Sequence, residues 1–263
     1  MEKQNRIPPI IHYCWFGGAR KSKLIRRCID SWQKTMPDYE IKCWNEKNFD
    51  INSISFVKQA IEKKKWAFAS DYVRLHALYT EGGIYLDTDV EIYKSLDPFL
   101  QHKFFTGIDT RVIDGNTMFF IESAIIGSEK RHEYLAQCME YYQNRDFILP
   151  NGEMDQTMIP DIISNILLSN NPKYEIRDIK QEFNDNFVIY PTSYFANSNC
   201  KTEEGLYAKH WNTFTWRDRG PIYSFCMKND LMKLYYFLEM FRIRSQRILN
   251  NIFFNENPPD SQR

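Results

Sequence analysis

The first 44 residues contain an apolar run, an amphipathic helix pattern and a second apolar run, in that order. Ile10–Phe16 is a short apolar run that ends at two glycines, as a buried strand does before a turn. Within Ser22–Thr35 apolar or small residues recur at intervals of three and four, and Tyr39–Trp44 then alternates. Strand, helix and strand in this order open a parallel sheet, so the sequence predicts an α/β fold.

The 263 residues fit one main domain followed by a short extension. We expect the domain to span residues 1–228, because no linker divides it. Residues 229–263 begin with a long helical pattern in which aromatic side chains lie among arginines, and they are predicted to form a C-terminal helical extension. Such a helix suits peripheral contact with a membrane surface, and it equally suits docking on the core with its basic side chains outward.

The overall charge indicates which partners to expect, and the cysteine pattern indicates the cellular compartment. Lysine plus arginine equals aspartate plus glutamate at 34 each, so the overall charge gives no reason to expect a nucleic-acid partner. The six cysteines lie far apart and form no CxxC pair, which favours free thiols in a reducing compartment. The N-terminal apolar run is too short to span a bilayer and lacks a cleavage site. We therefore expect a cytoplasmic protein, with peripheral contact at the inner face of the membrane.

Ile84–Tyr93 alternates strictly between apolar and polar residues and predicts one strand. One face of this strand would carry the polar side chains Tyr85, Asp87, Asp89 and Glu91. Three carboxylates in a row repel one another unless a base, water or a cation screens them. A hard divalent cation would remove the conflict and would also bind phosphate oxygens. For a DxD motif alone, a solvent-facing edge strand is the alternative interpretation.

The segment before this strand adds an acidic and a basic residue on a helix. Trp66–Thr80 carries one apolar stripe at helical spacing, and Gly82 and Gly83 follow it as the expected stop. Asp71 and Arg74 are three residues apart and share one side of this helix. A tight turn at the glycines would let the helix and the strand present their polar groups to one pocket. A surface ion pair is the alternative for Asp71 and Arg74 alone.

Four segments together resemble glycosyltransferase family 32, whose donor-site motif is shared by the large clostridial glucosylating toxins. The segments are IPPIIHYCWFGG, SWQKTMPDYEIKCWNEKNF, WAFASDYVRLHALYTEGGIYLDTDVE and YAKHWNTFTW. The resemblance implies a GT-A-type fold, a Rossmann-like α/β sandwich that binds a nucleotide-sugar. It also implies a Mn²⁺ or Mg²⁺ cofactor and retention of the anomeric configuration. Ser123, where the family often has Asn, and Asp155-Gln156, which lacks a Gly-Pro, depart from the pattern.

By position in the family pattern, the resemblance assigns roles to individual residues. Trp15 would stack on the nucleotide base, Asp87 would contact the ribose and metal-bound water, and Asp89 would bind the metal directly. The implied donor-binding residues are Trp15, Asn48, Ser70, Asp71, Arg74, Tyr85, Asp87 and Trp216. The implied metal ligands are Asp87, Asp89 and His210. The implied catalytic residues are Asp71, Arg74, Asp87 and Asp89.

The motif and the resemblance together favour a metal-dependent hexosyltransferase. The resemblance implies that it retains the anomeric configuration and acts in surface or capsular polysaccharide biosynthesis. The expected donor is a UDP-sugar, with GDP-mannose as the alternative, and the expected acceptor is a glycan or a lipid-linked saccharide. Two other classes stay open at this point. A phosphatase of the haloacid dehalogenase type also uses a DxD motif, although no later acidic metal motif follows here. A non-catalytic sugar-binding module would explain the aromatic residues but not the aligned carboxylates.

Overall fold

The computed structural model describes residues 5–183, 186–197, 205–213 and 231. The chain divides into two compact units, Met1–Lys21 with Ile25–Trp216 and Ser22–Leu24 with Arg217–Arg263. The predicted extension 229–263 lies outside the described residues apart from position 231, so it stays a prediction, as does the boundary at 228. Within the described ranges, no helix is long and apolar enough to cross a membrane.

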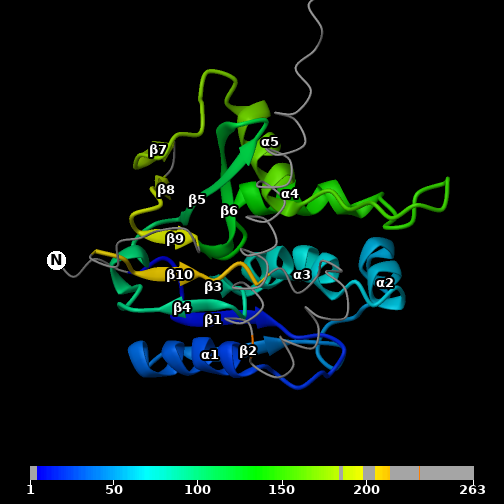
Figure 1. The fold of residues 1–263 in the computed structure, drawn as a ribbon, viewed down its shortest axis with the longest axis horizontal. Coiled ribbons are helices and arrows are strands. Elements are labelled where there is room, and N and C mark those ends of the chain that lie inside the picture. Colours follow the sequence, from blue (N-terminus) through cyan, green and yellow to red (C-terminus); the bar gives the residue numbers. More distant parts are fainter. Residues whose placement is uncertain (1–4, 184–185, 198–204, 214–230, 232–263) are drawn as a thin grey trace, which may run out of the picture. The chain divides into compact units, whose positions relative to one another are not determined.

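A seven-stranded mixed sheet forms the centre of the first unit, in the order β2-β1-β3-β6-β5-β8-β7 (Figure 1). Its strands are β1 (Ile10–Cys14), β2 (Glu40–Trp44), β3 (Gly83–Leu86), β5 (Phe104–Ile113), β6 (Asn116–Ser128), β7 (Gln181–Phe183) and β8 (Phe187–Tyr190). β1 pairs in parallel with both β2 and β3, and β6 runs antiparallel to β3 and β5. The predicted α/β class and its parallel opening are confirmed.

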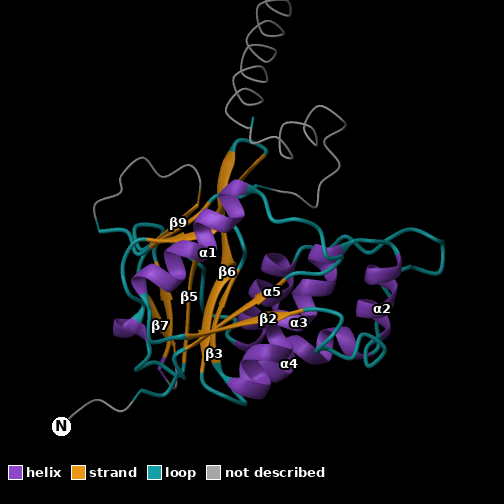
Figure 2. Cartoon of the chain, turned by 90° about the horizontal axis from the view of Figure 1, so that it is seen from below, coloured by secondary structure: helices purple, strands orange, loops and turns teal. Residues whose placement is uncertain are grey.

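Helices cover both faces of this sheet. The helices are α1 (Lys23–Thr35), α2 (Ser55–Glu62), α3 (Trp66–Glu81), α4 (Glu133–Gln143) and α5 (Ile159–Asn170), and a short 3-10 helix η1 spans Asp97–Phe99. Helices α2 to α5 contribute to one apolar core and lie together on one side of the sheet (Figure 2). Trp32 of α1 and Phe99 of η1 belong to a second core, on the opposite face. The large aromatic content is therefore used mainly for packing.

The turn between α3 and β3 depends on two glycines. Gly82 and Gly83 have φ angles of 71° and 110°, which side chains rarely adopt. A Cβ atom at Gly83 would lie 2.6 Å from the carbonyl oxygen of Ile10. His12 is fully buried, and its Nε2 lies 2.7 Å from the carbonyl oxygen of Gly82. The chain can therefore pass directly from α3 into the middle of the sheet, beside β1.

The prediction of one strand over Ile84–Tyr93 is wrong. β3 ends at Leu86, and a separate strand, β4 (Val90–Ile92), belongs to a three-stranded sheet with β9 (Phe195–Asn197) and β10 (Ala208–His210) in the order β4-β10-β9. The amide of Val90 donates to the carbonyl oxygen of Asp87 at 3.0 Å, which closes a turn over the DxD motif. The turn keeps the two aspartates close together and separates them from Glu91, which lies on β4.

Candidate functional site

The turn Asp87-Thr88-Asp89 connects the two sheets at the edge where the parallel strands β1, β2 and β3 end. The amide of Asp87 donates to the carbonyl oxygen of Ala124 on β6 at 2.9 Å, which fixes the turn to the large sheet. The carbonyl oxygen of Asp89 accepts from the amide of Trp211 at 3.0 Å, which fixes it to the chain that follows β10. In open α/β sheets this edge is the usual place for ligands.

Asp89 lies within a set of polar partners from the distant end of the described chain. β10 pairs antiparallel with β4 in a register that places His210 opposite Val90, next to Asp89. Nε2 of His210 lies 3.4 Å from Oδ1 of Asp89. Thr213 donates to the other oxygen, Oδ2, through its amide at 2.9 Å and its hydroxyl at 2.8 Å. Burial opposes ionisation, but the charge of His210 and the Thr213 hydrogen bonds hold the pKa of Asp89 below its ordinary value.

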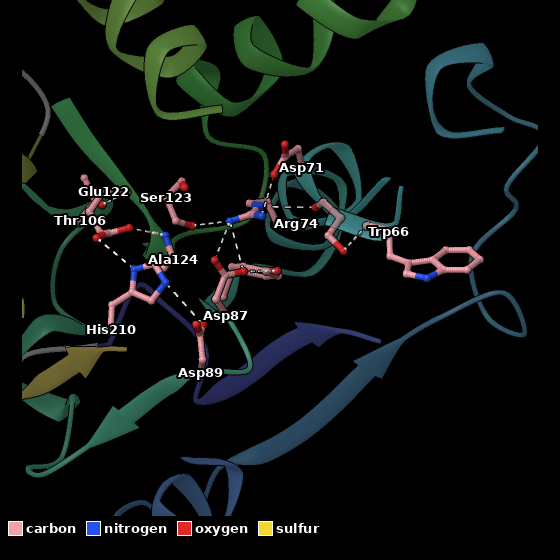
Figure 3. A network of polar contacts seen from close by, with 12 residues as sticks. Trp66, Asp71, Arg74, Asp87, Asp89, Thr106, Glu122, Ser123, Ala124 and His210 are labelled. Carbon is pink, nitrogen blue, oxygen red and sulfur yellow. Dashed lines mark hydrogen bonds and ion pairs between the residues drawn. The ribbon is translucent and has the colours of Figure 1, made fainter. Parts of the chain in front are cut away.

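Asp87, Asp89 and His210 form a group that fits a divalent metal. Each offers one ligand atom, and these atoms all lie within 4.8 Å of one another. Two carboxylate oxygens and one imidazole nitrogen suit Mn²⁺, and the oxygens also suit Mg²⁺. Figure 3 shows the two aspartates and His210 facing one another. The structure therefore brings together the three predicted metal ligands.

Arg74 is the central basic group of the site and is 4% exposed. Its Nη2 donates to Oδ1 of Asp71 at 2.7 Å, and its Nη1 donates to the carbonyl oxygen of Ser123 at 2.8 Å. Nη1 also lies 3.4 Å from Oδ1 of Asp87, so the guanidinium connects α3, β6 and the DxD turn (Figure 3). The pair is buried and belongs to this site, so the alternative of a surface ion pair is wrong.

Burial and charge act on the titration of these groups in opposite ways. Burial raises the pKa of Asp71 to about 7, although the Arg74 guanidinium opposes the shift. Burial also disfavours the charge of Arg74, but Asp87, Tyr85 and Asp71 raise the pKa of Arg74 well above its ordinary value. A permanently charged guanidinium is therefore held beside Asp87, where a diphosphate bound to the metal would approach.

Tyr85 positions Asp87. Its hydroxyl donates to Oδ1 of Asp87 at 2.8 Å, and its ring lies 4.6 Å from the guanidinium carbon of Arg74. Tyr85 is 1% exposed, so the ring is part of the core while the hydroxyl reaches the site. The structure shows Tyr85 in contact with the first aspartate of the motif, and its role in donor binding stays a prediction.

Of the other predicted donor residues, all but Trp216 lie within the part of the chain that the structure describes. Trp15 follows β1 and Asn48 lies beyond β2, and both of these strands run parallel to β3. Both polar groups of the Asn48 side chain hold its own turn, through the amide of Asn45 and the carbonyl of Cys43. The Ser70 hydroxyl donates to the Trp66 carbonyl one turn back along α3. Trp216 lies outside the described residues.

Three groups at the site were not predicted from the sequence. Glu122 is 3% exposed and faces His210, the Ser123 carbonyl holds Arg74, and Thr213 holds Asp89. The alternating pattern grouped Glu91 with the two aspartates. In the structure its Oε2 instead accepts hydrogen bonds from Arg27 and Trp211. A backbone carbonyl and a single threonine belong to no recognisable motif, so neither could be predicted as part of the site. Glu122 stands out only as a charged residue within a long apolar strand.

A family model matches residues 22–106 and is described as "Glycosyltransferase sugar-binding region containing DXD motif". The match contains α3, the glycine turn and the DxD turn. Residues 22–106 thus match the model of a glycosyltransferase sugar-binding region. The resemblance seen in the sequence is confirmed. In this sugar-binding region the DxD motif is the turn described above, and His210 is supplied from outside it.

The chain is also similar to curated proteins and to solved structures. "Uncharacterized glycosyltransferase L373" of Acanthamoeba polyphaga mimivirus is 26% identical over 221 residues, which cover 80% of this chain and 84% of the relative. "Inositol phosphoceramide mannosyltransferase 3" of Schizosaccharomyces pombe is 29% identical over 143 residues, which cover 50% of this chain and 36% of the relative. The solved structure "PaToxG Glycosyltransferase" is 19% identical with a TM-score of 0.45, covering 63% of this chain and 70% of that one. The family model and the relatives support glycosyltransferase activity.

Proposed function

We propose that the chain is a metal-dependent, retaining hexosyltransferase with a GT-A-type fold that uses a nucleotide-diphosphate sugar. The observation that carries the proposal is the convergence of Asp87, Asp89 and His210 beside the buried guanidinium of Arg74. Metal ligands and a fixed cation side by side match the charge of a leaving nucleoside diphosphate. A non-catalytic sugar-binding module requires no such combination.

Each residue of the site has a defined task in this proposal. A bound divalent metal would neutralise charge on the diphosphate as the sugar departs. Arg74 is held by Asp71 and by the Ser123 carbonyl, so its guanidinium is already oriented toward the phosphate side of the site. Tyr85 orients Asp87 by its hydroxyl, and Thr213 orients Asp89 by two hydrogen bonds. Because these side chains are already held in place, the site needs little reorganisation as negative charge develops on the leaving diphosphate.

Retention is proposed to proceed by front-face transfer through an oxocarbenium-like transition state. Asp87 and Asp89 belong to the metal group, and Oε1 of Glu122 accepts from the amide of Ala124 at 2.8 Å. The carboxylates of the described site are therefore engaged, which leaves none of them placed as a nucleophile. Proton NMR of the first-formed product tests this step, because inversion of the anomeric signal would exclude retention.

The proposed donor is a UDP-sugar, with GDP-mannose as the alternative, and the proposed acceptor is a glycan or a lipid-linked saccharide in surface polysaccharide assembly. The name of the S. pombe relative, an inositol phosphoceramide mannosyltransferase, supports a lipid-linked acceptor. We propose a cytoplasmic location with peripheral contact at the inner membrane face. The buried free thiols of Cys14, Cys28 and Cys138 agree with a reducing compartment.

Thermal unfolding with nucleotides tests the proposed function most directly. UDP together with Mn²⁺ should raise the melting temperature, whereas UDP with chelator should not, because ligands that bind only the folded state stabilise it. Slow hydrolysis of UDP-galactose, UDP-glucose, UDP-N-acetylglucosamine and GDP-mannose without acceptor then identifies the donor. Stabilisation by none of these nucleotides, together with release of phosphate from simple phosphate esters, would favour the phosphatase class.

Trp15→Ala is expected to raise the donor KM with little change in kcat. Trp15 is half-buried and follows β1, and stacking on a base contributes about 1–3 kcal/mol, so a rise of about fivefold or more is expected. One side of the ring already lies 4.8 Å from the ammonium of Lys21, so the stacking would use the other face. Trp44→Phe, beside the core histidine, is the matched control. An unchanged donor KM in Trp15→Ala would remove this residue from the base site.

His210→Ala is expected to raise the Mn²⁺ concentration for half-maximal activity by about tenfold or more, the usual scale for a weakened metal shell. His210 is the ligand that β10 adds to the two aspartates, and an octahedral metal needs more than those two side chains. The measurement is a Mn²⁺ titration at saturating donor. Unaltered Mn²⁺ dependence in an active variant would assign the third ligand to another residue.

A further inference from the structure

Glu122 is a buried carboxylate that the metal group does not include. It lies on β6, opposite the DxD turn, and its side chain is 3% exposed. Oε1 accepts from the amide of Ala124 at 2.8 Å, which fixes the orientation of the carboxylate. Oε2 lies 3.5 Å from Nδ1 of His210. Figure 3 shows the imidazole between Glu122 on one side and Asp89 on the other.

The Nδ1 atom of His210 needs such a partner. It is inaccessible to solvent and makes no hydrogen bond of ordinary geometry to the described residues. The nearest anionic oxygen is Oε2 of Glu122, while Nε2 points to Asp89. A small rotation of either side chain would convert the contact into an Nδ1–H hydrogen bond. Metal-binding histidines commonly donate their second N–H to a carboxylate in this way.

We propose that Glu122 is a positioning residue that holds His210 with its proton on Nδ1, so that the lone pair of Nε2 is directed to the metal between Asp87 and Asp89. The inference rests on the proposed metal dependence and adds a residue from outside the family-matched segment. β6 then holds two side chains of the site, Arg74 through the carbonyl of Ser123 and His210 through Glu122.

Glu122→Gln tests the proposal because it preserves size and removes the second acceptor oxygen. The amide of Ala124 still requires an oxygen, so the new side-chain NH₂ group would face Nδ1 of His210. This arrangement places the imidazole proton on Nε2 and blocks the metal. The dissociation constant of Mn²⁺, measured by calorimetry without donor, should therefore rise by about tenfold or more.

Asp109→Asn is the matched control. Asp109 lies on β5, across the hairpin from β6, and its carboxylate accepts from Nε of Arg111 at 3.0 Å. Its loss removes one negative charge near the site without changing the partner of Nδ1, so Mn²⁺ affinity should change by less than about threefold. Equal weakening in both variants would overturn the inference, because general charge would then explain the effect.

A measurement on the wild-type protein keeps the proposal testable if Glu122→Gln folds poorly. Nitrogen NMR of histidine-labelled wild type saturated with Mg²⁺ should show His210 protonated on Nδ1, and a proton on Nε2 would overturn the proposal. In the His210→Ala background, Glu122→Gln should have no additional effect on Mn²⁺ affinity, since its action passes through the imidazole. Wild type that binds neither metal would overturn the metal dependence as well, whereas wild-type binding unchanged by Glu122→Gln would overturn the role of Glu122 alone.

Discussion

Asp89→Asn is expected to lower turnover by about a thousandfold or more, since loss of the metal removes several kcal/mol of charge stabilisation. Asp89 is 8% exposed and supplies the most buried carboxylate of the metal group. The Asn side chain keeps an oxygen for the two Thr213 hydrogen bonds, so the turn should stay in place. Initial rates at saturating donor and Mn²⁺ measure the effect, and circular dichroism checks the fold.

Glu91→Gln is the matched control for Asp89→Asn. Glu91 lies two residues further along the same chain segment, but its carboxylate is bound by Arg27 and by Trp211 rather than by the metal group. Its removal should therefore leave turnover within a few-fold of wild type. Wild-type rates in excess chelator, or in Asp89→Asn, would contradict the metal-dependent mechanism.

Arg74→Met is expected to lower both turnover and stability. Turnover should fall by about a hundredfold or more, the scale for removal of one preorganised group that stabilises developing charge. At pH 8 the free energy of unfolding should fall by about 3–5 kcal/mol, because the buried carboxyl of Asp71 and the carbonyl oxygen of Ser123 both lose the guanidinium that pairs with them. Urea unfolding and initial rates measure the two effects separately.

The stability deficit of Arg74→Met should depend on pH with a definite sign. The folded-state pKa of Asp71 is already raised to about 7, so below that pH this carboxyl is neutral in both proteins. Loss of the guanidinium raises the folded pKa further, so the variant continues to lose stability as pH rises above about 7 while wild type does not. The double variant Asp71→Asn, Arg74→Met should regain stability but not turnover. A deficit that is constant from pH 6 to pH 8 would contradict this account.

Local patterns were sufficient to predict the first half of the fold. The apolar stripe of α3 and the two glycines that follow it identified both the helix and its end, and the parallel strands around α1 followed from period and order. The same reasoning from local patterns predicted one strand where the structure has two, β3 and β4. Alternation is a local property, and it is identical on the two sides of the DxD turn. The change of sheet depends on β10, which the local sequence does not contain.

The candidate site was predicted where it depends on the motif and missed where it depends on distant pairing. Asp71, Arg74, Asp87 and Asp89 come from one continuous segment, so their proximity follows from a helix, a turn and a strand end. His210 was named only through the family resemblance. Thr213 is 124 positions beyond Asp89, and Glu122 meets His210 only after β10 has paired with β4. Long-range register of this kind cannot be read from one sequence.

The pairing of β10 with β4 has a consequence for backbone hydrogen exchange. The two strands share three residue pairs, so β10 is a short segment that can open without unfolding the large sheet. A metal held by His210 and by the DxD turn would favour the closed form by about 2.7 kcal/mol at a hundred times its dissociation constant. Amides of β10 and of Trp211 and Thr213 should then exchange about a hundredfold more slowly with Mn²⁺ or Mg²⁺ than without, while those of β1 stay unchanged. The exchange rates of individual amides in β10 and the residues after it would therefore show whether the metal is bound.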